Sequence, residues 1–145
     1  MNPAVGYPRG MSKLTDLLQS IFPHPDNFGG LLGYDLESYS GGAARTSLQI
    51  EEKHLSPAGV THGGVISAFV DFSMGAAVFT ALAKGERTST IEFKINYLTP
   101  VKLGEKIFCD AKLKFKGRSH AVVECHVFRE EGKDIAFGMG TYNIY

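Results

Sequence analysis

An excess of charge of either sign is the first thing this chain lacks. Its 145 residues include 15 lysines and arginines and 15 aspartates and glutamates, so the formal net charge at pH 7 is zero. Proteins that bind a phosphate backbone or an anionic membrane generally present basic patches and a basic net charge. The balance therefore argues against nucleic acid and membranes as partners.

Cysteine is also scarce. The chain has two, Cys109 and Cys125. Two cysteines are too few for the disulfide framework of a small secreted domain, and they lack the C-x-x-C spacing of a zinc or redox site. His120 and His126 would share one face of a strand while Cys125 faces the other, so they do not form a compact set of metal ligands. We expect a reduced, cytoplasmic protein with no metal and no cofactor.

No apolar run is long and uninterrupted enough to suggest a membrane span. The longest, over 63–83, contains polar side chains, Asp71 among them, which is typical of a buried helix. The first ten residues include two prolines and no lysine-flanked apolar run, so they do not resemble a secretory signal. A chain of this length holds one core. We expect a strap with a short helix over 1–27 and a single domain over 28–145.

Hydrophobic periodicity predicts the order of the elements. A helical pattern covers 14–22, and a hairpin with a Gly-Gly turn joins strands over 31–39 and 44–52. A long apolar helix of about 20 residues starts near His62 and stops before Gly85.

Alternating strands fill the rest of the chain, over about 90–97, 106–116, 119–129 and 133–143. Each has one apolar and one polar face. The complete order predicts an α+β domain in which the long helix covers the apolar face of a six-stranded antiparallel sheet, with the last four strands forming a meander.

The start of the long helix is one candidate for chemistry. Thr61 or His62 can cap it, and the N–H groups of Gly63 and Gly64 have no intrahelical acceptor and carry the positive end of the helix dipole. Such donors can form an oxyanion hole, which stabilises the negative oxygen of a tetrahedral intermediate. The alternative is that the glycines only allow a tight entry into the helix.

Asp71 is the second candidate, because it is the single ionisable side chain of the helix after His62. A carboxylate among apolar neighbours is costly to bury and tends to mark a site. It can act as a general base or as a nucleophile. The structural alternative is a solvent-facing stripe on which Asp71 hydrogen-bonds to Ser67.

The spacing of the two candidates has a consequence for assembly. Gly63 and Asp71 are eight residues apart, which is about 12 Å of helix rise. A reacting carbonyl must lie about 3 Å from both the donor and the base. If both act on one carbonyl, they come from different subunits, with two long helices antiparallel across a twofold axis and two equivalent sites per homodimer.

Three sequence blocks resemble those of hotdog-fold thioesterases of the phenylacetate-pathway (PaaI-like) group. They are P-A-G-V-T-H-G-G-V-I-S-A-F-V-D over 57–71, T-I-E-F-K-I-N-Y-L-T-P-V-K-L-G-E over 90–105 and G-K-D-I-A-F-G-M-G-T-Y over 132–142. The resemblance covers roughly 28–143. It implies a six-stranded antiparallel sheet wrapped around a long central helix, and hydrolysis of an acyl-coenzyme A thioester without a metal or redox cofactor, in a homodimer or a homotetramer built as a dimer of dimers.

The same resemblance implies roles for individual residues. Asp71 activates water or attacks the thioester carbonyl, the Gly63 N–H holds the oxyanion, and His62 organises the junction of loop and helix. A hydroxylated residue near the start of the third strand, Thr90, holds the hydrolytic water; an ordinary strand threonine is the alternative. Family members usually carry asparagine six residues before the histidine, whereas this chain has Ser56, whose single hydroxyl reaches less far than an amide.

Substrate contacts are expected around these residues. The substrate-binding candidates are Gly64, Ser67, Phe72, Arg87 and Ser89. Coenzyme A would be held weakly at the surface by basic residues, the candidates being Lys84, Arg87, Lys102, Lys116 and Arg118, although scattered surface cations are the ordinary explanation for them. An apolar lining of Phe69, Phe72 and Met74 favours a medium-chain or aromatic acyl group.

Two other functions are compatible with this sequence. One is a non-catalytic acyl-coenzyme A binding hotdog protein, a sensor or regulatory subunit, which the serine at position 56 permits. The other is a hydratase or dehydratase on the same fold. Phe22-Pro23-His24-Pro25 superficially resembles a motif of hotdog dehydratases, but it precedes the first predicted strand, so we regard the match as coincidence.

Overall fold

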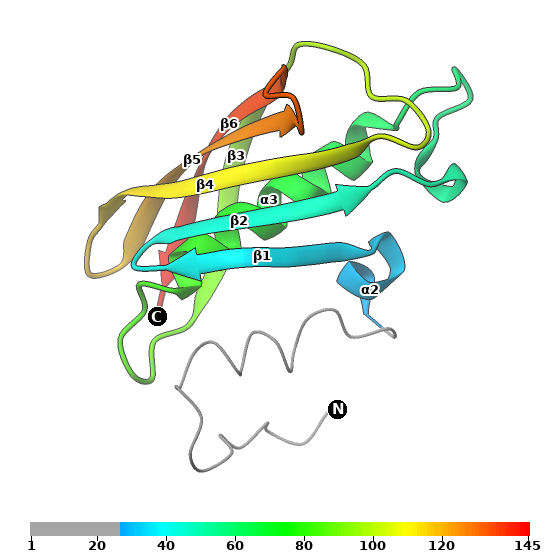
Figure 1. Ribbon diagram of the computed structural model, residues 1–145. Coiled ribbons are helices and arrows are strands. Elements are labelled where there is room, and N and C mark those ends of the chain that lie inside the picture. Colours follow the sequence, from blue (N-terminus) through cyan, green and yellow to red (C-terminus); the bar gives the residue numbers. More distant parts are fainter. Residues whose placement is uncertain (1–26) are drawn as a thin grey trace.

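The computed structural model describes residues 27–145 (Figure 1). The expected helix over 14–22 and almost all of the expected strap over 1–27 lie outside these residues. The described elements are, in chain order, α2 (Phe28–Leu32), β1 (Tyr34–Ser40), β2 (Ala43–Gln49), a 3-10 turn (Glu52–His54), α3 (Gly63–Phe79), β3 (Thr88–Tyr97), β4 (Lys106–Lys116), β5 (His120–Arg129) and β6 (Asp134–Ile144).

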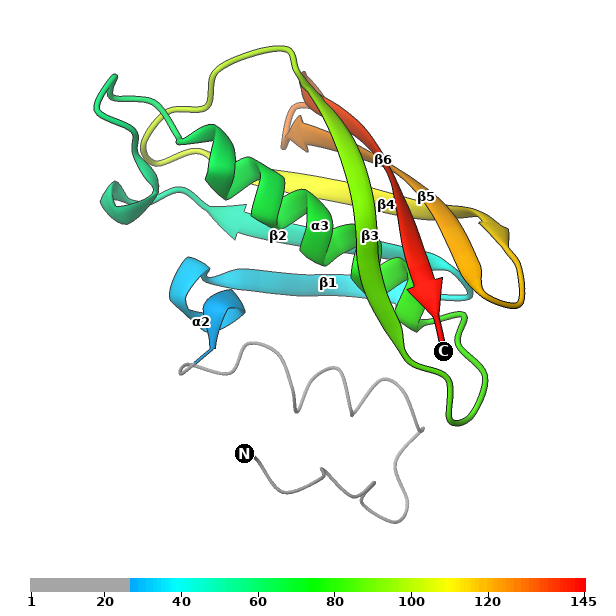
Figure 2. The same cartoon turned by 180° about the vertical axis from the view of Figure 1, so that it is seen from behind.

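The six strands form one antiparallel sheet, and α3 lies across one face of it (Figures 1 and 2). Alternate residues of β4 and β5 are buried against the helix, Cys109, Val123 and Cys125 among them. Phe69, Val70 and Met74 of α3 are fully buried on the other side of this core. The predicted α+β class, with one long helix covering a six-stranded antiparallel sheet, is confirmed.

The predicted meander of the last four strands is wrong in one respect. The strand order is β1-β2-β4-β5-β6-β3, so β4, β5 and β6 form a meander while β3 pairs with β6 at the far edge. The physical reason is the path of α3, which carries the chain across the sheet before β3 begins. The chain then returns to place β4 beside β2.

The ends of several elements also differ from the sequence prediction. Leu31 and Leu32 belong to α2, which Asn27 caps and which ends at Gly33 with φ +81°, so the first strand starts only at Tyr34. The second strand stops at Gln49, before the 3-10 turn. The long helix has 17 residues and ends at Phe79.

Thr80 explains the early end of α3. Its hydroxyl donates to the carbonyl of Ala77 at 2.8 Å and accepts from the N–H of Gly42 in the β1–β2 turn at 2.7 Å. The side chain thus ties the last helical turn to the hairpin, and the chain leaves the helix there. None of the helices in the described part of the chain is long and apolar enough to cross a membrane.

β3 departs from simple alternation at Ile91. Thr90 pairs with Tyr142 and Glu92 with Thr141, which leaves Ile91 as an extra, bulged residue. The bulge places Thr90 on the side that faces α3, together with Phe93, and leaves Ile91 57% exposed. The predicted apolar face of this strand is therefore wrong at Thr90 and Ile91.

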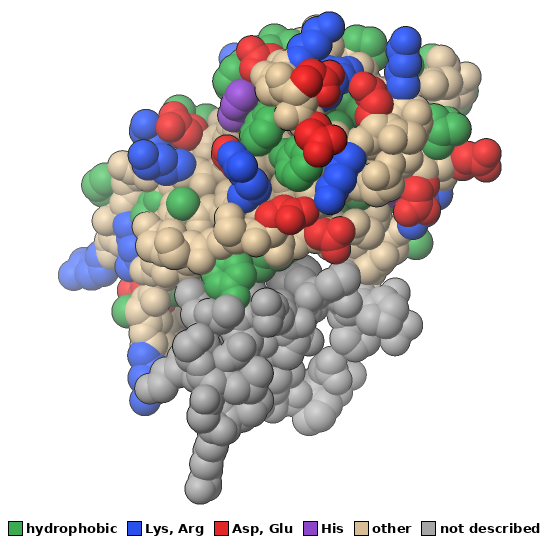
Figure 3. Space-filling model, in the orientation of Figure 1, with side chains coloured by type: hydrophobic (Ala, Val, Ile, Leu, Met, Phe, Trp, Pro, Cys, Tyr) green, Lys and Arg blue, Asp and Glu red, His purple; other side chains and the backbone are tan. Residues whose placement is uncertain are grey.

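The surface agrees with the balanced charge of the sequence. Acidic and basic side chains are interspersed on the face shown in Figure 3. Several are paired, as Arg45 is with Asp110 through two hydrogen bonds of 2.5 Å. Among the described residues, the face shown in Figure 3 offers no continuous basic patch for an anionic polymer.

Candidate active site

The N-terminus of α3 is capped by a histidine. The Nδ1 atom of His62 accepts a hydrogen bond of 2.8 Å from the N–H of Gly64, which confirms His62 as the cap and occupies one of the two donors expected for an oxyanion hole. The prediction that both glycine N–H groups are available is therefore wrong for Gly64. The Gly63 N–H donates to no acceptor among residues 27–145.

A tyrosine from β3 fixes this first turn. The Tyr97 hydroxyl donates to the carbonyl oxygen of Gly63 at 2.9 Å and is also in contact with the Ser67 hydroxyl. Because the tyrosine has a single O–H, the Ser67 hydroxyl donates to it. Ser67 therefore bonds to Tyr97 and not to Asp71. The alternative interpretation of the sequence, in which Asp71 hydrogen-bonds to Ser67 on a solvent-facing stripe, is wrong.

Asp71 lies two turns further along α3 and is half-buried. Its Oδ1 atom accepts a hydrogen bond of 2.8 Å from the Thr90 hydroxyl and another of 2.7 Å from the Tyr142 hydroxyl. Its Oδ2 atom has no hydrogen-bond partner among the residues that the structure describes. One carboxylate oxygen is thus anchored, and the other is free to meet a substrate.

Two buried tyrosines surround this carboxylate. Burial, with the hydrogen bond to Asp71 next, strongly raises the pKa of Tyr142, so this residue stays a proton donor. Burial and the charge of Asp71 likewise raise the pKa of Tyr34, whose hydroxyl is buried with no partner within 27–145. The Tyr34 ring stacks on Phe72, with ring centroids 5.0 Å apart.

The apolar lining expected for an acyl group is only partly present. Phe69 and Met74 are fully buried in the core beneath α3, so they do not line an open surface, and that prediction is wrong for both. Phe72, which follows Asp71 in α3, is half-buried, and its ring stacks on Tyr34. Of the three predicted lining residues, only Phe72 is not fully buried.

The loop before α3 is held by a buried histidine. His54 is fully buried; its Nδ1 accepts from the Glu51 N–H and its Nε2 donates to the Leu32 carbonyl, both at 2.9 Å. Its own carbonyl accepts from the N–H of His62. The Ser56 carbonyl accepts from the Gly59 N–H, which closes a turn over 56–59.

An arginine fixes the β3–β4 connection, which passes beside this loop. The guanidinium of Arg129, 9% exposed, donates to Glu105 at 2.7 Å, to the Thr99 hydroxyl at 3.0 Å and to the Pro100 carbonyl at 2.6 Å. The hydrogen bond from Arg129 is the main cause that lowers the pKa of Glu105. The same connection accepts the Thr61 N–H through Val101.

The remaining predicted site residues are not brought to Asp71 within one protomer. Ser56 lies in the loop before α3, and Arg87 is exposed just before β3, where its backbone is hydrogen-bonded to that of Tyr145. Ser89 is exposed beside Thr90 and pairs with Asn143.

Of the basic residues expected to hold coenzyme A, Lys116 forms a salt bridge of 3.0 Å with Glu86. In residues 27–145 no cluster of acidic, histidine or cysteine side chains could hold a metal.

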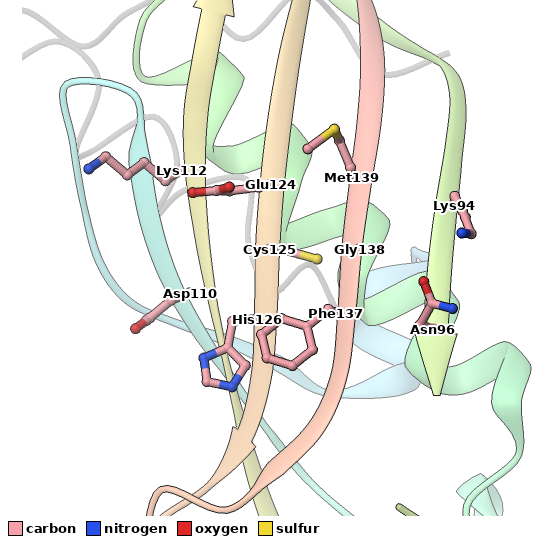
Figure 4. A pocket seen from close by; sticks show the side chains of 10 residues that line it. All are labelled: Lys94, Asn96, Asp110, Lys112, Glu124, Cys125, His126, Phe137, Gly138 and Met139. Carbon is pink, nitrogen blue, oxygen red and sulfur yellow. The ribbon is translucent and has the colours of Figure 1, made fainter. Parts of the chain in front are cut away.

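A hollow of about 620 Å³ lies on the opposite face of the sheet (Figure 4). Its lining includes the outward residues of the central strands, and the rings of His126 and Phe137 stack there 4.6 Å apart. The His126 ring is hydrogen-bonded to Asp134. Asp71 and Gly63 do not contribute to this lining, so the hollow is separate from the candidate site.

Sequence reasoning missed two residues of the site, Tyr97 and Tyr142. Both lie within the sequence blocks quoted above, and both occupy apolar-face positions of their strands, which favours a core role for them. Their hydroxyl partners on α3 become visible only once β3 and β6 are placed next to the helix.

Comparison with known proteins gives a consistent result. A family model described as the thioesterase superfamily matches residues 58–136, more than half of the chain. Human acyl-coenzyme A thioesterase 13 is 28% identical over 139 residues, covering 92% of this chain and 99% of its own.

Solved structures agree with this match. The conserved protein PA5202 from Pseudomonas aeruginosa is 33% identical with a TM-score of 0.76, covering 80% of this chain and 91% of its own. The protein smu.793 from Streptococcus mutans, bound to acetyl CoA, is 26% identical with a TM-score of 0.73, covering 78% of this chain and 89% of its own.

Proposed function

This chain belongs to the thioesterase superfamily and has the hotdog fold that its three sequence blocks predict, and from that premise we propose that it hydrolyses acyl-coenzyme A thioesters at two equivalent sites shared across a homodimer. One observation carries the proposal. Among residues 27–145, the Gly63 N–H and Oδ2 of Asp71 have no hydrogen-bond partner, and the two groups lie eight residues apart on one helix.

The chemistry follows from these two groups. The Gly63 N–H of one protomer holds the thioester carbonyl oxygen as it becomes negative, while Oδ2 of Asp71 in the other protomer takes a proton from a water molecule. The water oxygen bonds to the carbonyl carbon, the C–S bond breaks, and the leaving thiolate takes up the proton that Asp71 accepted, which restores the carboxylate. Direct attack by Oδ2, followed by hydrolysis of the anhydride, is the alternative route.

Thr90 can serve the same step. Its hydroxyl donates a hydrogen bond to Oδ1 of Asp71. The two lone pairs of the hydroxyl oxygen can then accept a hydrogen bond from a water molecule beside the carboxylate. Support for coenzyme A as the carrier comes from relatives: the human one is named an acyl-coenzyme A thioesterase, and the Streptococcus mutans structure holds acetyl CoA. Phe72 is the apolar contact we propose for the acyl group.

The proposed dimer uses the edge of the sheet formed by β3. An edge strand offers unpaired backbone groups, which another chain can satisfy. Ile91 and Tyr97 are 57% and 49% exposed on this edge, although both are large and largely apolar. Pairing β3 with a second copy would cover them and bring two α3 helices side by side. The further pairing of dimers into a tetramer stays a prediction.

Release of free thiol tests the proposed function. The full-length protein is incubated with a panel of acyl-coenzyme A esters and a thiol-trapping dye, beside Asp71→Asn, which keeps the shape of the side chain. We expect thiol release by the parent and a loss of about 10²-fold or more in the variant. Tight binding without turnover on every ester would instead indicate a sensor, and addition or loss of water at a double bond would indicate a hydratase.

A further inference from the structure

Thr90 and Tyr142 are directly opposite each other on β3 and β6, and both point toward α3. Their hydroxyls donate to the same atom, Oδ1 of Asp71, at 2.8 and 2.7 Å. The Tyr142 hydroxyl also lies 3.0 Å from the backbone carbonyl oxygen of Asp71, so its single O–H lies between the side chain and the main chain of that residue, closer to Oδ1.

The position of Tyr142 makes its hydroxyl suited to holding the Asp71 carboxylate. Tyr142 is 2% exposed, and its ring packs against Gly75 one turn beyond Asp71, where a Cβ atom would stand 3.7 Å from Cε1. A side chain buried to this degree loses little further freedom when it donates a hydrogen bond, so its hydroxyl is a fixed reference point for the carboxylate.

The bulge at Ile91 is what brings the two hydroxyls together. Without the extra residue, strict alternation would turn Thr90 to the outer face, opposite to Phe93. With it, a cross-strand pair of hydroxyls faces one oxygen of Asp71. The free oxygen, Oδ2, is then presented in one orientation.

We propose that Tyr142 is a positioning residue that, together with Thr90, binds Oδ1 of Asp71 and thereby reserves Oδ2 for the water or the thioester carbonyl. This inference rests on the proposed function, in which Asp71 is the base or nucleophile. It assigns different tasks to the two oxygens of the carboxylate: one anchors, the other reacts. Tyr142 itself touches no substrate in this account.

Tyr142→Phe tests the assignment, because it removes only the hydroxyl and keeps the buried ring. We expect kcat to fall about tenfold or more, with KM changed by no more than about twofold. The acidic limb of the pH profile of kcat/KM should move to higher pH, since the carboxylate loses a donor that favours its charged form. The position of that limb does not depend on how much of the variant is folded.

The matched control is Tyr39→Phe. The Tyr39 hydroxyl is also buried but has no hydrogen-bond partner among residues 27–145, so its loss should leave both the rate and the acidic limb as in the parent. If the acidic limb of the pH profile of kcat/KM lies at the same pH in Tyr142→Phe as in the parent, the inference is overturned, whatever the rate of the variant. If Asp71→Asn released thiol as fast as the parent, the proposed function would fail first, so the two failures are distinguishable.

Discussion

Tyr97 donates a hydrogen bond of 2.9 Å to the carbonyl oxygen of Gly63, whose N–H at the start of α3 has no acceptor in the described part of the chain. The same strand, β3, carries Thr90, which binds Asp71. One edge strand, β3, therefore contacts both groups on α3 to which we assign chemistry, Gly63 and Asp71. A shift of β3 would move the hydrogen-bond partners of both residues.

Tyr97→Phe should loosen the Gly63 turn. We expect kcat to fall several-fold and the free energy of unfolding to fall by about 0.5–1 kcal/mol, since the hydroxyl is partly exposed. Steady-state thiol release and urea unfolding measure the two effects. Tyr145→Phe, at an exposed C-terminal position, is the control. A parental kcat in Tyr97→Phe would remove this tyrosine from the account.

Ile91→Lys should separate the proposed dimer. A charged side chain at the bulge would be unfavourable in a β3–β3 interface but harmless on a free surface. We expect sedimentation to show monomers and thiol release to be lost. Phe115→Lys, which changes an apolar residue of similar exposure on β4, should keep both assembly and activity. An active dimer of Ile91→Lys would contradict this placement of the interface.

Glu105 should contribute stability that acid removes. Because the Arg129 hydrogen bond holds the pKa of Glu105 below its ordinary 4.5, the folded carboxyl binds protons less readily than the unfolded one. The contribution is complete above pH 4.5 and is lost as the pH falls through the lowered pKa.

Glu105→Gln should lower the free energy of unfolding at pH 7 by about 1 kcal/mol, and by less at pH 3. Urea unfolding at the two values measures the difference. Glu131→Gln, an exposed carboxyl in the β5–β6 turn, is the control. Equal losses at both pH values would contradict the assignment.

Tyr142 should make the fold sensitive to alkali. Its pKa is raised in the folded protein, by burial first and by Asp71 next, so the folded state keeps a proton that the unfolded state releases. The stabilisation is complete below about pH 10, the ordinary tyrosine pKa, and is lost as the pH rises above it. Tyr142→Phe should therefore lose less stability than the parent between pH 9 and 11. Equal changes in the free energy of unfolding of Tyr142→Phe and the parent over this pH range would contradict the prediction.

The sequence was sufficient where one local pattern decides the structure. The hairpin turn at Gly41 and Gly42, the His62 cap and the alternation on β4 and β5 follow from residue types at fixed spacing. The eight-residue spacing of Gly63 and Asp71 also needs no coordinates.

The rest depends on contacts between distant segments. The position of β3 follows from where α3 delivers the chain, which no periodicity in β3 itself encodes. The bulge at Ile91 reverses the expected faces of two residues, and it is defined by pairing with β6. The roles of Tyr97 and Tyr142 follow from that pairing, and the occupied N–H of Gly64 depends on the orientation of the His62 ring.

Mixed dimers test most directly whether two protomers build each site. Asp71→Asn removes the carboxylate, and Gly63→Pro removes the N–H at the first helical position, where proline is tolerated. His62, at φ −62° and ψ 134°, already has the backbone that precedes proline. Each variant alone should be inactive.

Equal amounts of the two variants are unfolded together and refolded, and thiol release is measured. With shared sites, each mixed dimer has one site with both Gly63 and Asp71 intact, so random reassortment should restore about one quarter of the parental activity. A mixture as inactive as its two components, in a sample that mass spectrometry shows to contain mixed dimers, would contradict the shared site.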